Sequence, residues 1–189
     1  MENINQIAWD FIGELEGKGV GVGYVPSKNS GVTIATGVDL KEKNEEYFRK
    51  ISVSENIITK IKPYFALKGA EASEVAGNLK LDDNEILEVD TAVKKNYAND
   101  IRLKYEEATG KSFTSLSSAK QTVIVSIGLQ YGSFHNTPSF WKAVVADDWE
   151  AVESELRDFG DNYTTRRIKE ANLLSAIKKK PKQDTKDLK

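Results

Sequence analysis

One carboxylate near the N-terminus is the first candidate for catalytic chemistry. Glu16 ends an apolar pattern at helical spacing, and Gly17, a residue type common just past a helix end, follows it. A carboxylate at that end faces the negative pole of the helix dipole, which disfavours its charged form. A general acid needs such an environment, because it must hold a proton near neutral pH. The alternative is an ordinary surface acid, for which Glu14 is the internal comparison.

A hydroxyl and a second carboxylate follow in a glycine-containing stretch. Thr33 lies in a β-branched segment, and Asp39 follows it by six residues. Both side chains could project from this strand region toward the end of the first helix. A carboxylate with a neighbouring hydroxyl can position and deprotonate a water molecule. A strand threonine followed by a turn aspartate is also a common structural pattern, so both interpretations stay open here.

The elements that carry these residues follow from the periodicity of apolar side chains. The pattern predicts an amphipathic helix over about residues 3–16 and then a small hairpin or meander through residue 36. A long helix is expected from Asp82 or Asp83 to Gly110. Further helix starts are expected at Ser54, about residue 70, Ser117 or Ser118, Thr137-Pro138, Asp147 or Asp148, and Thr164 or Thr165.

This order of elements predicts an α+β fold in two lobes. A small lobe with short strands would cover about residues 17–80, and a larger helical lobe residues 1–16 plus 90–177. The long helix would join them, and a cleft between the lobes is a common place for a ligand. Together they would form one catalytic domain over residues 1–177, followed by a flexible basic tail over residues 178–189.

Composition excludes several classes of protein. The chain has 189 residues, 39% of them hydrophobic, no cysteine and one histidine, His135. Whole-chain disorder, a disulfide scaffold, a Cys-based zinc site and a His-rich metal site are therefore excluded. The formal net charge is −2, but the tail carries six Lys and two Asp, so the body is acidic and shows no nucleic-acid footprint. The expected place of His135 is an exposed polar turn.

Seven of the 13 glycines fall between Gly13 and Gly37. Alternating glycines are also typical of phosphate-binding loops. The Gly-x-Gly-x-x-Gly motif of such loops, however, requires glycine at positions that Val22 and Tyr24 occupy here. A helix also precedes the loop where a strand is required, and no Gly-Lys-Ser/Thr follows. Nucleotide binding is therefore rejected.

Three N-terminal motifs together resemble a known enzyme family. In chain order they are Phe11-Ile-x-x-Leu15-Glu16-Gly17, Gly23-Tyr24-Val-Pro26 and Ser30-Gly-Val-Thr33-Ile-x-x-Gly37-x-Asp39-Leu40. This combination resembles the N-terminal lobe of pesticin-like muramidases, relatives of the phage-type lysozymes of glycoside hydrolase family 24. Supporting segments in the helical lobe are Ser126–Gly132, Phe140–Ala151 and Arg166–Ala171. The resemblance covers nearly the whole chain except residues 41–80 and the tail.

The resemblance implies a lysozyme-like fold and a substrate. That substrate is the β-1,4 bond between N-acetylmuramic acid and N-acetylglucosamine in the glycan strands of peptidoglycan. Glu16 would protonate the leaving oxygen, and Thr33 and Asp39 would orient or activate the attacking water in an inverting mechanism. Tyr24 and Gln130 would contact sugar, by stacking and by hydrogen bonding. No metal and no cofactor would be needed.

One departure from the common phage pattern affects the second carboxylate. Many phage lysozymes place it nine residues after the glutamate, where this chain has Val25. The pesticin-like subgroup instead offers an aspartate six residues after the threonine, which is Asp39. A catalytically inactive domain that binds peptidoglycan or a partner therefore remains the alternative function. A chitinase- or transglycosylase-like activity is a third alternative.

The sequence also sets expectations about partners and location. No signal peptide and no membrane span is visible, so the chain is expected to be made in the cytoplasm. It would reach the cell wall or periplasm through another system, as a phage endolysin or an antibacterial toxin or effector. We expect a monomer with no nucleic-acid partner, and an immunity or inhibitor protein is a possible partner.

Overall fold

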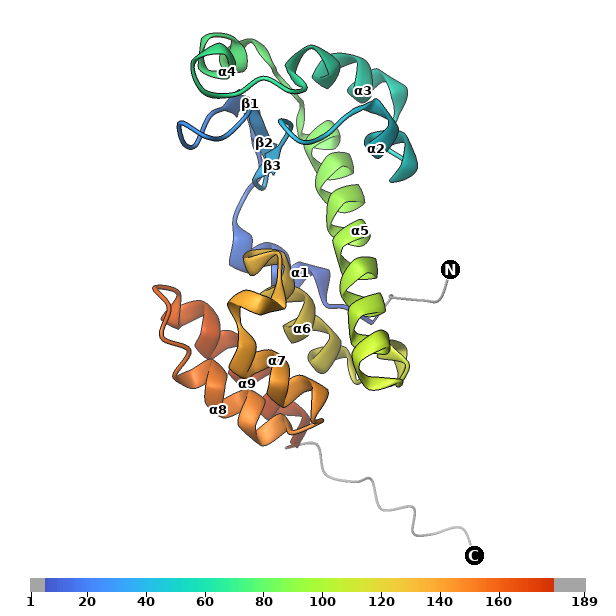
Figure 1. The fold of residues 1–189 in the computed structure, drawn as a ribbon, viewed down its shortest axis with the longest axis vertical. Coiled ribbons are helices and arrows are strands. Elements are labelled where there is room, and N and C mark those ends of the chain that lie inside the picture. Colours follow the sequence, from blue (N-terminus) through green and yellow to red (C-terminus); the bar gives the residue numbers. More distant parts are fainter. Residues whose placement is uncertain (1–5, 179–189) are drawn as a thin grey trace, which may run out of the picture. The chain divides into compact units, whose positions relative to one another are not determined.

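The computed structural model describes residues 6–178 and combines one small sheet with many helices (Figure 1). Its strands and helices, in chain order, are α1 (Trp9–Glu16), β1 (Val20–Tyr24), β2 (Thr33–Ala35), β3 (Val38–Asp39), α2 (Glu45–Lys50), α3 (Glu55–Ile61), α4 (Gly69–Val75), α5 (Asp83–Thr109), α6 (Ser118–Tyr131), α7 (Pro138–Val145), α8 (Trp149–Arg157) and α9 (Thr164–Lys178). Short 3₁₀ turns separate several of them. The predicted α+β class, with strands confined to the N-terminal part, is confirmed.

The chain divides into two compact units. The sheet unit comprises Gly13–Asn99, and the helical unit comprises residues 1–12 with 100–189, of which 6–12 and 100–178 are described. The boundaries fall inside α1 and inside α5, so the sheet unit is larger than the small lobe predicted over residues 17–80. The basic tail lies outside the described residues except for Lys178, and both the tail and the inter-lobe cleft stay predictions.

The three strands form an antiparallel sheet in the order β1-β2-β3. Thr33 pairs with Asp39 across β2 and β3, and Tyr24 pairs with Thr33 across β1 and β2. The outer edge of β1 is also covered, because Val22 forms an isolated bridge with Lys80. Glycine is required along β1, since a Cβ on Gly21 would lie 2.4 Å from the carbonyl oxygen of Leu81.

The sheet unit has its own hydrophobic core. Buried side chains from β2, α3 and the start of α5 pack together, including Ile34, Ile57 and Val89. Phe48 of α2 is fully buried and stacks on Phe65 with ring centroids 5.7 Å apart. This core packs the sheet against α5 by burying apolar side chains of both.

The helical unit is built around α6. Residues Gln121–Gly128 of this helix are all buried. Its approach to α5 is close, because a Cβ on Gly128 would lie 2.4 Å from Cδ1 of Ile101. The helices α7, α8 and α9 complete the unit, and Asp148 caps α8 by accepting the N–H of Ala151.

Two local predictions differ from the structure. The first helix begins at Trp9 and not near residue 3, because the N–H of Ala8 donates to the Thr122 hydroxyl of α6 and not to a helical carbonyl. Residues 1–5 lie outside the described part. The sequence also predicts no helix where α2 lies, although Asn44 caps it by accepting the N–H of Tyr47. Six residues are too few for a clear periodic signal.

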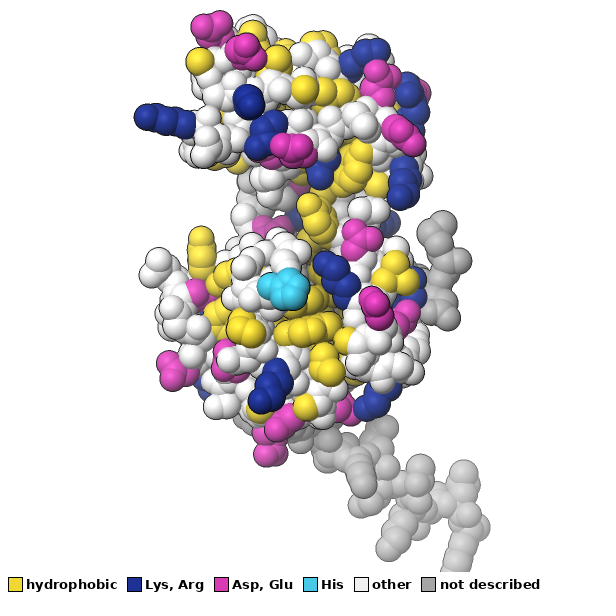
Figure 2. All heavy atoms as spheres, in the orientation of Figure 1, with side chains coloured by type: hydrophobic (Ala, Val, Ile, Leu, Met, Phe, Trp, Pro, Cys, Tyr) yellow, Lys and Arg dark blue, Asp and Glu magenta, His cyan; other side chains and the backbone are white. Residues whose placement is uncertain are grey.

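The surface of the described residues mixes charges of both signs with hydrophobic and polar side chains (Figure 2). His135, the single histidine and the cyan side chain of that view, is exposed, as predicted. None of the helices in residues 6–178 is long and apolar enough to cross a membrane.

Candidate active site

Glu16 is the last residue of α1, and its surroundings differ from those of its neighbour Glu14. Its side chain is 15% exposed, and its Oε2 lies 2.9 Å from Nζ of Lys94 on α5. Glu14 is exposed. Gly17, with φ of +79°, ends the helix directly afterwards. Glu16 therefore differs from Glu14 in its burial and in its contact with a cation.

The ammonium of Lys94 gives Glu16 a cationic partner that the sequence does not reveal. Nζ of Lys94 lies 2.9 Å from Oε2 of the carboxylate, where little water screens the attraction between the two charges. Lys94 lies 78 residues away in the chain, so no local pattern points to it.

Lys94 also faces a second carboxylate on its own helix. Oδ2 of Asp90, one helical turn earlier, lies 4.0 Å from Nζ of Lys94. The other oxygen, Oδ1, accepts both the N–H of Thr36 at 3.0 Å and its hydroxyl at 2.7 Å. Asp90 thus ties α5 to the turn between β2 and β3.

Thr33 and Asp39 both bind the same residue of the preceding loop, Gly31. The Thr33 hydroxyl donates to the carbonyl of Gly31 at 3.2 Å. Both Asp39 oxygens accept the N–H of Gly31 at 3.1 Å, and Oδ1 also accepts the N–H of Lys41 at 2.9 Å. A carboxylate offers about four acceptor sites, so the described residues leave Oδ2 of Asp39 with room for one more donor.

Tyr24 lies in the same cross-strand row as these two residues. The register pairs Tyr24 with Thr33 and Thr33 with Asp39, so three of the predicted site residues stand side by side across the sheet. Tyr24 is 38% exposed, whereas Thr33 is 2% exposed. A half-open aromatic ring beside polar groups can stack on a sugar face.

Gln130, the remaining predicted site residue, belongs to the helical unit. Its side-chain oxygen accepts a hydrogen bond from Nη2 of Arg167. Arg167 is buried and also pairs with Glu170 and, at 2.9 Å, with Asp161. The neighbouring Arg166 also pairs with Glu170, at 3.3 Å. The Gln130 oxygen serves this buried network, which leaves its amide NH₂ group as the part suited to a sugar hydroxyl.

The same network perturbs two ionisable groups. Burial raises the pKa of Asp161, but hydrogen bonds from the Tyr131 hydroxyl, Arg167 and the N–H of Tyr163 outweigh it and hold that pKa below its usual value. Burial, together with the Asp161 carboxylate, raises the pKa of the Tyr131 hydroxyl. These shifts have structural causes in a buried ion-pair network.

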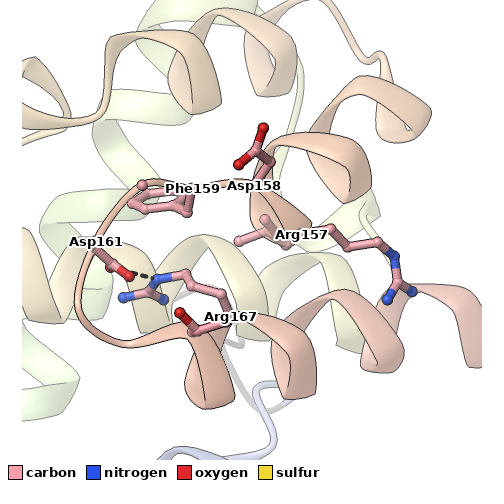
Figure 3. A pocket seen from close by; sticks show the side chains of 8 residues that line it. Arg157, Asp158, Phe159, Asp161 and Arg167 are labelled. Carbon is pink, nitrogen blue, oxygen red and sulfur yellow. Dashed lines mark hydrogen bonds and ion pairs between the residues drawn. The ribbon is translucent and has the colours of Figure 1, made fainter.

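A small cavity of about 170 Å³ lies beside this network, between the end of α8 and the start of α9. Figure 3 shows Asp161 directed at Arg167 and Arg157 directed away from the cavity. Two of the charged residues that line it, Asp161 and Arg167, pair with each other at 2.9 Å. Within residues 6–178, no group of three or more His, Asp or Glu side chains is arranged to hold a metal ion.

The structure thus places Glu16, Tyr24, Thr33 and Asp39 in one compact unit and Gln130 in the other. It adds Lys94 and Asp90, which the sequence does not single out. Asp90 and Lys94 are four residues apart on a highly charged helix, and in a sequence such a spacing is typical of an exposed ion pair on the surface. Only their packing against α1 and the β2–β3 turn distinguishes them from the other charges of α5.

Comparison with known proteins identifies the family of the chain. No curated protein matches the chain. Residues 6–150, which include all the site residues of the sheet unit and Gln130, match the family model for pesticin, described as a bacterial toxin homologue of phage lysozyme, C-terminal part. The chain therefore belongs to the pesticin family of phage-lysozyme homologues.

Proposed function

We propose that this protein is a muramidase that hydrolyses the β-1,4 bond between N-acetylmuramic acid and N-acetylglucosamine in peptidoglycan. Membership of a family of phage-lysozyme homologues supports this substrate. The observation that carries the proposal is the position of Glu16, a half-buried acid at the end of α1 held by a cation, beside an exposed and unexceptional Glu14.

In the proposed mechanism, Glu16 donates a proton to the leaving glycosidic oxygen. Bound glycan would exclude water from the carboxyl of Glu16 during this proton transfer. The sugar passes through an oxocarbenium-like transition state. The leaving group departs with the proton of Glu16.

A water molecule attacks the opposite face of the sugar ring. The Thr33 hydroxyl donates its hydrogen to Gly31, so its lone pairs can accept a hydrogen bond from that water and orient it. The remaining acceptor site on Oδ2 of Asp39 can take the proton. This arrangement inverts the configuration at the anomeric carbon.

The family description favours a role as a bacterial toxin over that of an endolysin. As a toxin, the protein would be delivered to the cell wall or periplasm by another system. The producing cell would then need an immunity or inhibitor protein that blocks the same site.

The test is digestion of purified sacculi, with identification of the products by mass spectrometry and NMR. Wild-type protein should release fragments with new muramic-acid reducing ends, initially as the α-anomer. Glu16→Gln, which keeps the shape and removes the proton donor, should lower the rate by about 10²–10⁴-fold. Glu14→Gln, the matched control, should keep the wild-type rate. Full activity of Glu16→Gln would reject Glu16 as the acid.

A second function has one observation in its favour. Asp39 accepts three hydrogen bonds from backbone N–H groups, an arrangement that suits a structural carboxylate as well as a base. A domain that binds peptidoglycan without cleaving it would keep this loop. Co-sedimentation with sacculi, without any new reducing ends, would identify that function. Anhydro-muramic ends would indicate a transglycosylase.

A further inference from the structure

We propose that Lys94 and Asp90 of α5 are positioning residues that hold the Glu16 carboxylate in place for proton donation. This inference rests on the proposed function, because it assigns Glu16 as the general acid. Neither residue needs to touch the substrate.

The two oxygens of Asp90 have separate tasks. Oδ1 accepts both hydrogen bonds from Thr36, which fixes the carboxylate independently of Lys94. Oδ2 then faces Nζ of Lys94 at 4.0 Å, a distance at which attraction is electrostatic and not a hydrogen bond. Asp90 is therefore an anchor for the ammonium, which forms an ion pair with Glu16 at 2.9 Å.

Burial makes this row of charges effective. The side chains of Glu16, Lys94 and Asp90 are 15%, 16% and 12% exposed. Exposed ion pairs contribute little because water screens them, but these three are largely withdrawn from water. Close packing fixes the geometry further, since a Cβ on Gly19 would lie 3.2 Å from Oδ2 of Asp90 and 2.6 Å from Cγ2 of Ile86.

Glu16 needs such support because of where it stands in the chain. It is the final residue of α1, next to Gly17, and its own side chain has three rotatable bonds. Lys94 lies well inside α5, a helix of 27 residues, so its backbone is rigid. Its side chain is only 16% exposed, so packing restricts the ammonium, and the ammonium in turn can restrict the position of the acid at the helix end.

The same two residues relate Glu16 to the strands that carry the water-positioning groups. Thr36 forms the turn that joins β2 to β3, and these strands carry Thr33 and Asp39. Asp90 holds that turn, and Lys94, one helical turn later, holds Glu16. Residues 90–94 of α5 thus contact both Glu16 and the β2–β3 hairpin within the sheet unit.

The test compares Lys94→Met with Lys94→Arg and with Lys95→Met, whose parent residue is exposed next to Lys94. Rates are measured on soluble peptidoglycan fragments, together with thermal unfolding. Lys94→Met should lower kcat by about 10- to 100-fold with KM little changed, because a misplaced acid costs rate and not binding. Lys94→Arg should restore most of kcat, and Lys95→Met should match the wild type.

Asp90→Asn provides a second variant that does not depend on the folding of Lys94→Met. Its amide oxygen can still accept from Thr36, while the anchoring charge is lost, so kcat should fall by a smaller factor. A carbon-13 NMR signal from the Glu16 carboxyl provides a readout without catalysis. The chemical shift of this signal should change in Lys94→Met and stay the same in Lys95→Met.

The outcomes separate the two proposals. A Lys94→Met variant with the kcat of Lys95→Met, or an unmoved Glu16 signal, overturns the positioning role while leaving Glu16→Gln as the test of the muramidase. If Lys94→Met and Lys94→Arg lose kcat equally and their Tm falls as well, Lys94 has only a structural role, and the positioning role is overturned. If Glu16→Gln retains full activity, both proposals fail.

Discussion

Thr33 and Asp39 face each other across β2 and β3, and their side chains bind opposite sides of one residue. The Thr33 hydroxyl donates to the carbonyl of Gly31, and the Asp39 carboxylate accepts from the N–H of Gly31. The loop before β2 is thereby fastened to both strands of the hairpin. The same contacts orient the two side chains that are proposed to handle the attacking water.

Gly31→Ala should disrupt this arrangement. A Cβ at this position would lie 2.6 Å from Oδ1 of Asp39 and 2.8 Å from the carbonyl oxygen of Leu67. Overpacking of this kind costs about 1–3 kcal/mol, and the displaced carboxylate should also lower the hydrolysis rate. Thermal unfolding and digestion of sacculi measure the two effects. Gly77→Ala, whose Cβ would meet nothing within 4 Å, is the control. Equal behaviour of the two variants would show that the loop adapts.

Thr33→Val should lower the rate by about 10- to 100-fold, because it keeps the shape of threonine but cannot orient a water. Thr33→Ser retains the hydroxyl and should stay within a few-fold of the wild type. The measurement is the initial rate on soluble fragments, with the folded fraction of each variant checked by circular dichroism. A Thr33→Val variant as fast as the wild type would remove Thr33 from the mechanism.

The stability of the helical unit should depend on pH through Asp161. Its folded-state pKa is held below the unfolded value of about 3.9, so it stabilises the fold above that pH. This contribution is lost as the pH falls through the lowered folded-state pKa. At pH 7, Asp161→Asn should reduce the free energy of unfolding by about 1–3 kcal/mol. The difference from wild type should shrink toward pH 2.

Urea unfolding at several pH values measures this dependence. Asp158→Asn is the matched control, because Asp158 lines the same cavity but is exposed. It should change stability little at any pH. A loss in Asp161→Asn that is the same at pH 7 and pH 2 would contradict a role for the charge of Asp161.

Removal of residues 179–189 should affect binding and not chemistry. This segment carries five Lys and two Asp in an otherwise acidic protein. Its attraction to an anionic envelope should weaken as added salt shortens the Debye length from about 10 Å at 0.1 M to about 3 Å at 1 M. The shortened protein should bind whole sacculi less well at low salt and equally at high salt. Its rate on short glycans should be unchanged, and a slower rate there would place the tail in catalysis.

Much of the fold can be read from the order of the residues. The long helix, the buried helix α6 and the caps at Ser117 and Asp148 match the predicted positions, because each depends on neighbours within a few residues. The prediction fails at the start of α1. There the N–H of Ala8 bonds to Thr122, a residue 114 positions away.

The candidate site divides in the same way. The sequence by itself determined the family and the residue types at Glu16, Thr33 and Asp39, because their motifs are local and carry their spacing with them. It could not indicate that Lys94 faces Glu16 or that Asp90 holds Thr36, because these partners are 78 and 54 residues apart in the chain. Only the packing of α5 within the sheet unit brings them together. The ionic surroundings of the acid are therefore decided by tertiary structure, since charge acts through distance in space and not along the chain.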